Sequence, residues 1–504
     1  MQTSEPRAGS VGGDLDVLIV GAGVSGINVA YRLQERCPEL SYRIVEAREG
    51  FGGTWDLFRY PGIRSDSDFF TLAFPFHPWR GDEAIVGGAQ IMGYLREVVG
   101  AYGIDRHTTY STKVTSADWS SAQARWRVEC ATPDGPLALT PRFLVVCTGY
   151  YDYDHPHDPR LPGVEDFAGR VVHPQFWPDD LRYTGARVAV VGSGATAVSL
   201  VPALADGGAR VTMVQRTPSY VLAQPRRDAL ADTLRRRLPP GVAHQVMRVR
   251  NSGLQWGLFQ ACKIAPNRMR RLLRRGAVAG TGSRQVVDRH FDPPYNPWEQ
   301  RLCIDPDGGF FTAIRDGQAR VVTGAIERVV PQGLRMSDGT VVEADVLVTA
   351  TGLSIKLYGG IDVRVDGAPV DAGAGYAYVG AMLSGVPNLA FCVGYLNMSW
   401  TMRSDLTARF VARVLRRLVD TGMDVVVPEP PPDLGPGRPL MDMPSGYLAR
   451  AAHLMPRTTR RYPWAMKQNV VLDAWGTNRA DLDNGLRWSR YPRHAVSAHD
   501  APPR

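Results

Sequence analysis

Two glycine-rich turns, each between a strand pattern and a helix pattern, constrain the fold of this 504-residue chain more than any other feature. They read Gly21-Ala-Gly23-Val-Ser25-Gly26, after the apolar run 16–20, and Gly192-Ser193-Gly194-Ala195-Thr196-Ala197, after the run 186–191. The glycines allow a tight turn, and the following helix presents its first N–H groups to a phosphate. Two such units predict an α/β protein with two Rossmann-like, doubly wound domains, each with a dinucleotide site.

The residues after the second strand of each unit distinguish the two nucleotides. The strand at 42–45 ends in Glu46, whose carboxylate can accept hydrogen bonds from a ribose diol, so FAD fits the first site. The strand at 210–214 is followed by Arg216 and Thr217, and an arginine there can hold a 2′-phosphate, which favours NADPH. The alternatives are a glycine-rich turn of any α/β protein and an ordinary surface arginine. The order of strand, turn, helix and second strand favours the nucleotide sites.

Two such sites imply hydride transfer from NADPH to flavin, and the cysteines restrict the chemistry of the reduced flavin. Disulfide reductases share this layout but need a redox-active cysteine pair near the flavin. None of the six cysteines forms a CxxC or similarly close pair. The reduced flavin is therefore expected to react with oxygen or with a small organic acceptor.

Residues 51–66 end in an acid, Asp66, that packing alone does not demand. A Gly-Gly pair allows close approach of the backbone to a flat ligand, and Tyr60-Pro61-Gly62 predicts a rigid turn that aims Asp66 inward. The residues expected to lie along the flavin are Gly53, Thr54 and Trp55.

Two longer motifs carry a family resemblance. Residues 167–178 match FxGxxxHxxxW(P/D), and residues 52–66 match (A/G)GxWxxxx(F/Y)P(G/M)xxxD at every fixed position. The chain thus resembles the type I Baeyer-Villiger monooxygenases, a branch of the flavin-containing monooxygenase superfamily. With residues 66–72, 397–401 and 463–464 it is most similar to the ethionamide-activating subgroup, from about residue 14 to about residue 490.

The resemblance implies roles for several residues. Arg301 matches the position of the catalytic arginine and Asp66 becomes its charge partner, while Val114 is assigned to the FAD site. His173 and Trp177 would belong to a linker that couples motion of the NADPH domain to catalysis. One departure is Gln300, which stands where the family has a lysine that assists NADPH phosphate binding.

The implied reaction inserts one oxygen atom, from O2, next to a ketone carbonyl and gives an ester or lactone. Reduced flavin adds oxygen at C4a, and the peroxide anion attacks a carbonyl, whereas the neutral hydroperoxide oxidises sulfur or nitrogen. A fixed guanidinium, Arg301, favours the anion and offsets the developing charge. Three alternatives stay open: oxygenation of sulfur or nitrogen, a nucleotide-binding flavoprotein with a non-catalytic interaction role, and a structural or phosphate contact for Arg301.

The domain boundaries are set by the two units. Residues 14–150 and 325–425 are expected to form a discontinuous FAD domain, completed by the strand within 345–352. Residues 160–324 should form the NADPH domain, with a helical insertion at about 222–290. Residues 426–504 should pack on the FAD domain and end in a disordered tail from His494.

Composition excludes other classes. The formal charge of +8 could suggest a nucleic-acid partner, but only four of the 58 basic residues are lysines and no base-reading module is present, so no nucleic-acid partner is expected. No signal peptide or spanning segment is visible, which with unpaired cysteines predicts a cytoplasmic protein.

His155-Pro-His157 is typical of a loop, and no metal site is expected. Residues 266–275 favour a solvated helix cap, with a peripheral membrane contact as the alternative; the oligomeric state stays open.

Overall fold

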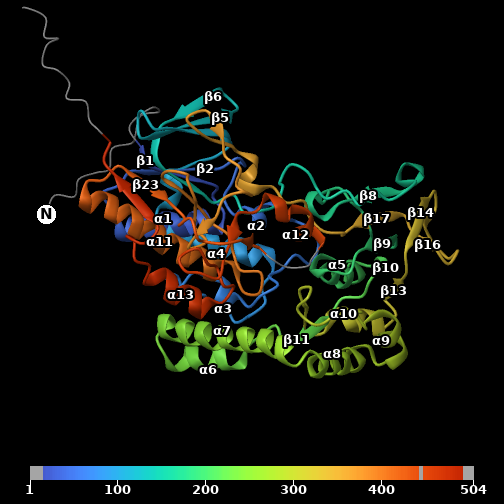
Figure 1. Cartoon of the computed structure of the whole chain (residues 1–504). Helices are drawn as coiled ribbons and strands as arrows, with labels where there is room; N and C mark the ends of the chain where they lie inside the picture. Colours follow the sequence, from blue (N-terminus) through green and yellow to red (C-terminus); the bar gives the residue numbers. More distant parts are fainter. Residues whose placement is uncertain (1–14, 442–445, 492–504) are drawn as a thin grey trace, which may run out of the picture.

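The computed structural model describes residues 15–441 and 446–491 of the chain. Two sheets with flanking helices, one mostly parallel and one entirely parallel, lie at opposite ends of the molecule, and a helical arm runs beneath them (Figure 1). The first sheet contains, in the order in which its strands are hydrogen-bonded, β20 (Ala377–Tyr378), β21 (Met382–Leu383), β22 (Leu389–Phe391), β7 (Pro141–Val146), β1 (Leu15–Val20), β2 (Tyr42–Val45) and β3 (Thr108–Thr109).

The centre of this sheet is covered on both faces. In β1, Val17 and Ile19 pack into one core cluster and Leu18 and Val20 into another, because alternate side chains of a strand point to opposite faces. β1 pairs in parallel with β2 and β7, so its backbone is satisfied on both sides. This explains why the sequence shows a continuous apolar run there rather than alternation.

The second sheet is parallel throughout. Its order is β13 (Ala319–Thr323), β10 (Arg210–Gln215), β9 (Arg187–Val191), β17 (Val346–Thr349) and β8 (Arg170–Val172). β17 pairs with β9 and β8, so the predicted return of the chain to the first domain at residue 325 is wrong: the chain stays in the second domain until Thr349. The reason is that the sequence of an apolar parallel strand does not show which strands it pairs with.

The remaining strands form smaller sheets. A five-stranded sheet contains β19 (Ala368–Pro369), β18 (Asp362–Val365), β4 (Lys113–Ser120), β5 (Arg125–Thr132) and β6 (Gly135–Leu139). A three-stranded sheet contains β14 (Ile326–Val330), β15 (Gly333–Met336) and β16 (Val341–Glu343). The two-stranded pairs are β11 (Val221–Gln224) with β12 (Cys303–Pro306), β23 (Val425–Pro428) with β26 (Leu486–Ser489), and β24 (Arg438–Pro439) with β25 (Arg457–Thr458).

The α-helices flank the sheets or form the arm. Outside the arm they are α1 (Val24–Arg36), α2 (Thr54–Leu57), α3 (Phe69–Leu72), α4 (Gly88–Ala101), α5 (Ala195–Asp206), α10 (Gly309–Arg315), α11 (Trp400–Thr421), α12 (Gly446–Ala451) and α13 (Val470–Asn478). Short 3-10 turns are η1 (Ile104–His107), η2 (Val164–Asp166), η3 (Pro174–Phe176), η4 (Leu357–Gly360) and η5 (Ala452–Leu454).

The arm consists of α6 (Ala229–Arg237), α7 (Pro240–Ile264), α8 (Pro266–Thr281) and α9 (Arg284–His290). It matches the predicted helical insertion, except that residues 221–224 form β11 and the helices begin at Ala229. Proline at the first position of α7 and α8 suits a helix start, since that position needs no N–H donor. Arg248 of α7 fastens the arm to the first domain by donating to the carbonyls of Thr71 and Ala73 at 2.9 and 2.7 Å.

The C-terminal segment packs on the first domain. Trp464, Ala480 and Leu486 share a core cluster with the strands of the first sheet. Arg413 of α11 donates to the carbonyls of Thr477 and Ala480, where the unpaired carbonyls at the end of α13 need donors. The predicted disordered tail lies outside the described residues.

Candidate functional site

One cavity of about 1760 Å³ joins the two halves of the molecule. Both glycine-rich turns line it, together with the loop at 51–66, the segment before β12 and the inner side of α7. Sequence-predicted residues on its wall include Gly21, Gly23, Ser25, Glu46, Gly53, Thr54, Trp55, Asp66, Val114, Gly192, Ser193, Gly194, Ala195, Thr196, Arg216, Thr217 and Arg301. Residues from widely separated parts of the chain therefore meet at a single space.

The first turn requires glycine where it approaches other parts of the backbone. Gly21 has φ +104°, and a Cβ there would lie 2.7 Å from the carbonyl oxygen of Cys147. A Cβ on Gly53 would lie 3.2 Å from the Cα of Gly23, so the two loops approach each other closely at the cavity wall. Gly23, the N-cap of α1, provides no side-chain cap, which leaves the first N–H groups of the helix for an anion.

Glu46 is held in place by backbone donors. Its carboxylate accepts hydrogen bonds from the N–H groups of Ala22 at 2.7 Å and Arg48 at 3.0 Å. Burial raises the pKa of Glu46, and these two donors oppose the shift. A carboxylate has further lone pairs, so a ribose diol can still bind beside these two contacts.

The second turn repeats this arrangement. Gly192 has φ +137°, and a Cβ there would lie 2.2 Å from the carbonyl oxygen of Ala350. Gly194, the N-cap of α5, provides no side-chain cap for the helix. The Ser193 hydroxyl donates to the Thr217 carbonyl at 2.9 Å and contacts the Ser219 hydroxyl at 2.9 Å, which ties the turn to the end of β10.

Arg216 and Gln300 lie on the wall of the same cavity. Both side chains are exposed. Arg216 forms no salt bridge with an acid in the part of the chain that the structure describes. Its guanidinium is therefore available to a phosphate, and the amide of Gln300 can offer only neutral hydrogen bonds there.

Asp66 sits after the expected turn. The N–H of Ile63 donates to the Tyr60 carbonyl at 3.1 Å, and Gly62 has φ +79°. A Cβ on Gly62 would lie 2.4 Å from the Ser199 carbonyl oxygen, so the turn packs directly against α5 of the second domain. The Asp66 side chain is exposed to the cavity although protein surrounds it.

Two guanidiniums influence Asp66. Desolvation by the surrounding protein raises its pKa, and the positive charges of Arg64 and, to a smaller extent, Arg301 oppose that rise. Arg64 is half-buried and donates from Nη2 to the Ile304 carbonyl at 2.7 Å, while burial lowers its own pKa. Sequence reasoning paired Asp66 with Arg301 alone and missed Arg64, although an arginine two residues before the acid was a visible signal.

Four predicted residues lie away from the cavity wall. A Cβ on Gly26 would lie 1.9 Å from the Gly21 carbonyl oxygen, and Ala197 is fully buried, so both serve close packing of helix against turn. Nδ1 of His173 accepts from the N–H of Gln175 at 3.1 Å, and burial lowers the pKa of His173. Trp177 packs edge-on to Tyr183 with ring centroids 6.4 Å apart.

Two further wall residues were not assigned from the sequence. The indole N–H of Trp400, at the start of α11, donates to the Ser25 hydroxyl at 2.8 Å. The Tyr153 hydroxyl lies 3.0 Å from the Thr54 hydroxyl. Both contacts connect the first turn and the adjoining loop to distant segments, so only the folded chain reveals them.

The cysteines include one spatial pair. All six are buried and free, and Cys147, which directly follows β7, interacts with Cys392, which directly follows β22. Burial and Cys392 raise the pKa of Cys147 well above its ordinary value. A thiol held in its protonated form is a poor nucleophile, so this pair lacks the activated thiolate that thiol–disulfide exchange requires.

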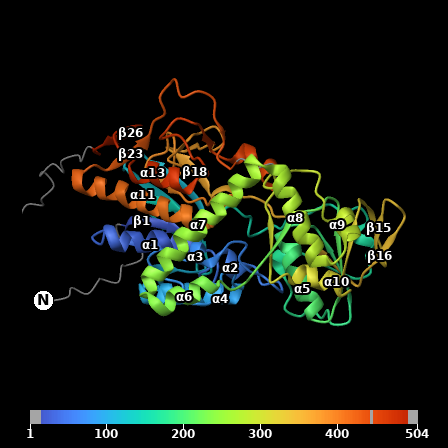
Figure 2. The same ribbon diagram turned by 90° about the horizontal axis from the view of Figure 1, so that it is seen from below.

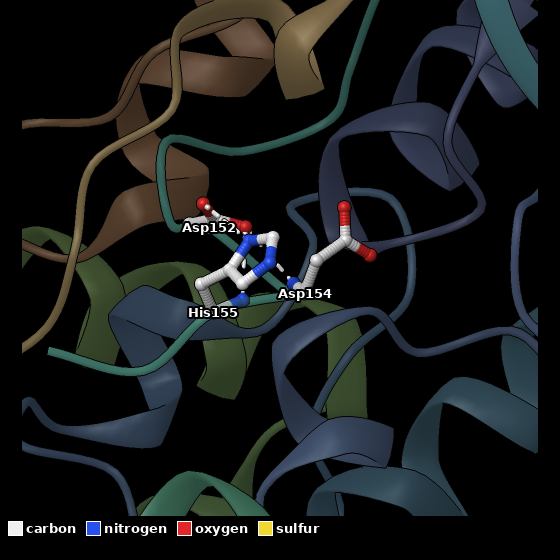
Figure 3. A group of neighbouring side chains, drawn as sticks. All are labelled: Asp152, Asp154 and His155. Carbon is white, nitrogen blue, oxygen red and sulfur yellow. Dashed lines mark hydrogen bonds and ion pairs between the residues drawn. The ribbon is translucent and has the colours of Figure 1, made fainter.

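A group of carboxylates and an imidazole lies on the first crossover between the domains. Figure 3 shows the His155 ring turned toward Asp152, and their side-chain atoms are 3.5 Å apart. With Asp154, the three residues offer ligand atoms within 4.8 Å of one another. Lys113 and Lys356 approach Asp154 at 2.9 and 3.0 Å, so cations of the chain already neutralise the group. We therefore interpret it as an ion-pair cluster that joins the crossover to neighbouring segments.

These features define a class: a protein with two dinucleotide-binding units whose turns share one cavity with a carboxylate and two guanidiniums. The family model described as "Pyridine nucleotide-disulphide oxidoreductase" matches residues 18–252. The chain is 48% identical over 480 residues to the FAD-containing monooxygenase EthA of Mycobacterium tuberculosis, covering 95% of this chain and 98% of that protein. It is 41% identical over 480 residues to the probable FAD-binding monooxygenase AlmA of Acinetobacter baylyi, covering 94% and 95%.

Solved structures agree on the fold. A steroid monooxygenase bound to NADP superposes with a TM-score of 0.78 at 20% identity, covering 95% of this chain and 100% of that one. A cyclohexanone monooxygenase with bound ε-caprolactone gives 0.75 at 19% identity, covering 94% and 100%. The chain belongs to the family of FAD-containing monooxygenases, and its fold is that of the Baeyer-Villiger monooxygenases. The sequence prediction of family and fold class is confirmed.

Proposed function

We propose that this chain uses FAD and NADPH to insert one oxygen atom of O2 next to the carbonyl of a small ketone, giving an ester or lactone. The observation that carries the proposal is the position of Asp66, Arg64 and Arg301 on the wall of the cavity that both glycine-rich turns also line. A positive site at the junction of two nucleotide sites suits charge that develops on a carbonyl oxygen.

The residues present fit both cofactors. Gly21 and Gly23 line the cavity where a pyrophosphate would bind, and Glu46 retains lone pairs for a ribose. At the second turn, Ser193 orders the loop and Arg216 offers a guanidinium for a 2′-phosphate. FAD when bound supplies the redox chemistry that activates O2, with electrons from NADPH.

The chain's own groups then have definable tasks. Arg301 offers a fixed positive charge where negative charge develops on the substrate carbonyl, an effect worth roughly 3 kcal/mol for one preorganised group. Asp66 balances that charge and orients the guanidinium, since an unpaired cation in a shielded site is costly. His173 and Trp177 lie on the segment after β8 and would transmit motion of the second domain rather than contact substrate.

The test compares wild type with Arg301→Ala, using anaerobic stopped-flow with NADPH and product analysis in air with a ketone. We expect normal flavin bleaching and a loss of ester formation on the order of a hundredfold. Full ester formation by Arg301→Ala would refute the assigned role. NADPH oxidation that yields neither product nor peroxide would instead support a non-catalytic flavoprotein.

A matched thioether tests the alternative reaction, oxygenation of sulfur or nitrogen. Ketone oxidation should gain relative to sulfide oxidation as pH rises, because carbonyl attack needs the ionised oxidant. The cavity is large enough for either the ketone or the thioether, so its volume does not discriminate between them. We place the reaction in a reducing compartment, the cytoplasm, because all six cysteines are free.

A further inference from the structure

The helical arm carries a charge unlike that of the rest of the chain. Its four helices, from residue 229 to residue 290, contain thirteen Arg and Lys residues and only two acids, Asp232 and Asp288, a net charge of +11. The formal net charge of the whole chain is +8, so the remainder carries a net charge of −3. A segment with a net charge of one sign attracts partners of the opposite sign and repels a second copy of itself.

The longest helix of the arm, α7, has two opposite faces. The inner face holds His244, Met247, Asn251 and Cys262, all buried, and extends to the cavity through Leu254 and Leu258. The outer face holds apolar side chains that fall on one side of the helix at 3.6 residues per turn: Val242, Val246, Val249, Trp256 and Ile264. These five are 41% to 81% exposed.

This outer stripe is long. α7 has 25 residues, which corresponds to about 37 Å. Two glycines, Gly253 and Gly257, fall on the same side, so no polar side chain interrupts the stripe before Gln260, near its end. An apolar strip of this length on a helix face marks an interaction site rather than scattered surface residues.

The arm also carries exposed cations. Among its described residues, the exposed basic residues without a salt bridge to an acid are Arg236, Arg237, Lys263, Arg268, Arg271, Arg275 and Arg289. Seen from below, α7 and α8 lie on the near side of the molecule, with α6 beside the start of α7 (Figure 2). Figure 1 places both helices along one edge of the molecule.

We propose that the outer face of α7 and α8 docks on an anionic lipid bilayer, with the apolar stripe at the boundary of headgroups and acyl chains and the arginines on the headgroups. A helix pair with an exposed apolar stripe, exposed cations and no acid is the pattern that such a surface recognises. A second copy of the chain fits less well, because two cationic surfaces would meet. No helix among the described residues is long and apolar enough to span a membrane, so the contact is peripheral.

This surface differs from the one suggested by the sequence. The sequence places a membrane contact at residues 266–275, but there Leu273 is buried against Tyr220 and Leu302, as a helix cap over the pair β11 and β12. The larger part of the exposed apolar area lies on α7 instead. Because the inner side of α7 lines the cavity, docking would set one wall of the cavity close to the bilayer.

The experiment is co-sedimentation of the FAD-loaded protein with vesicles of phosphatidylcholine alone or of equal parts phosphatidylcholine and phosphatidylglycerol. The stripe variant is Val246→Gln, Val249→Gln, Trp256→Gln; the charge variant is Arg268→Gln, Arg271→Gln, Arg275→Gln. Matched controls outside the arm are Val171→Gln with Val341→Gln, and Arg182→Gln with Arg320→Gln and Arg335→Gln. All substituted side chains are exposed, so folding should be preserved, as flavin absorbance and the melting temperature would verify.

Wild type should bind the anionic vesicles and not the neutral ones. The charge variant should bind roughly a hundredfold more weakly, about fivefold per basic residue, and the stripe variant at least about tenfold more weakly, with both controls unchanged. Absence of wild-type binding, equal binding to neutral vesicles, or full binding by the stripe variant would overturn the proposal. If wild type is a dimer and the stripe variant is a monomer, the face binds a second copy of the chain. If wild type and the stripe variant bind a DNA fragment equally well, the arm binds nucleic acid. Either result would overturn the proposal.

Discussion

Arg64 donates a hydrogen bond of 2.7 Å to the carbonyl oxygen of Ile304, although the two residues are 240 positions apart. The contact fastens the loop that carries Asp66 to β12, the strand that begins just after Arg301. The two guanidiniums and the carboxylate are thereby held on one wall, and Arg64 opposes the rise in the pKa of Asp66 more strongly than Arg301 does.

Replacing Arg64 should shift the acid limb of the pH profile of activity to higher pH. In Arg64→Met the attraction that lowers the pKa of Asp66 is lost, so the pKa should rise further and the carboxylate should protonate at higher pH. As pH is lowered, activity should therefore be lost at a higher pH than in wild type, and Arg64→Lys should partly restore the wild-type profile. The measurement is kcat/KM for a ketone across pH. Arg59→Met, on an exposed arginine of the same loop, serves as the control, and an unshifted profile in Arg64→Met would contradict the assignment.

Arg216 and Gln300 should set the choice between NADPH and NADH. A charge-assisted hydrogen bond is worth about 1.5–3 kcal/mol, so Arg216→Gln should raise the KM for NADPH roughly ten- to hundredfold and leave NADH unchanged. Gln300→Lys should act in the opposite direction, because it adds a cation at the same cavity wall. Steady-state kinetics with both nucleotides measures the effect; equal losses with NADH would show that Arg216 does not bind the phosphate.

Glu46 should be required for retention of FAD. Glu46→Gln replaces one carboxylate oxygen by an NH2 group, which cannot accept a hydrogen bond. One of the two N–H groups, that of Ala22 or that of Arg48, therefore loses its acceptor. The amide also offers the ribose diol only a neutral acceptor in place of a charge-assisted one worth about 1.5–3 kcal/mol, so FAD should bind roughly ten- to hundredfold more weakly. Flavin absorbance after gel filtration reports the loss. Asp56→Asn, which breaks the nearby bridge to Arg48, is a control that should keep its flavin.

His244 should make the folded state sensitive to acid. Burial first, and Arg248 second, lower the pKa of His244 to about 4. Its folded pKa lies below the unfolded value near 6.5, so stability is constant above about pH 6.5 and decreases as pH falls toward 4. The full effect is roughly 3 kcal/mol in the free energy of unfolding. Urea denaturation of wild type and His244→Phe at several pH values should show a smaller acid loss in the variant, and parallel losses would count against this interpretation.

Much of the fold could be predicted from local sequence motifs. The strands predicted at 42–45 and 186–191 match β2 and β9 within one residue, because glycine turns and apolar runs are written in consecutive residues. The residues expected at the turns lie on one cavity wall, except Gly26 and Ala197, which pack behind it. The roles of Asp66, Arg301 and His173 stay predictions.

By itself the sequence determined that this protein has two dinucleotide units, a loop ending in Asp66 and an arm rich in arginine. Tertiary structure alone decided that β17 belongs to the second sheet, that Arg64 joins Asp66, and that α7 turns Leu254 toward the cavity and Val249 outward. The physical reason is that periodicity and turn chemistry act between neighbours along the chain. Pairing of parallel strands and meeting of distant charges depend instead on how the whole chain crosses between its domains.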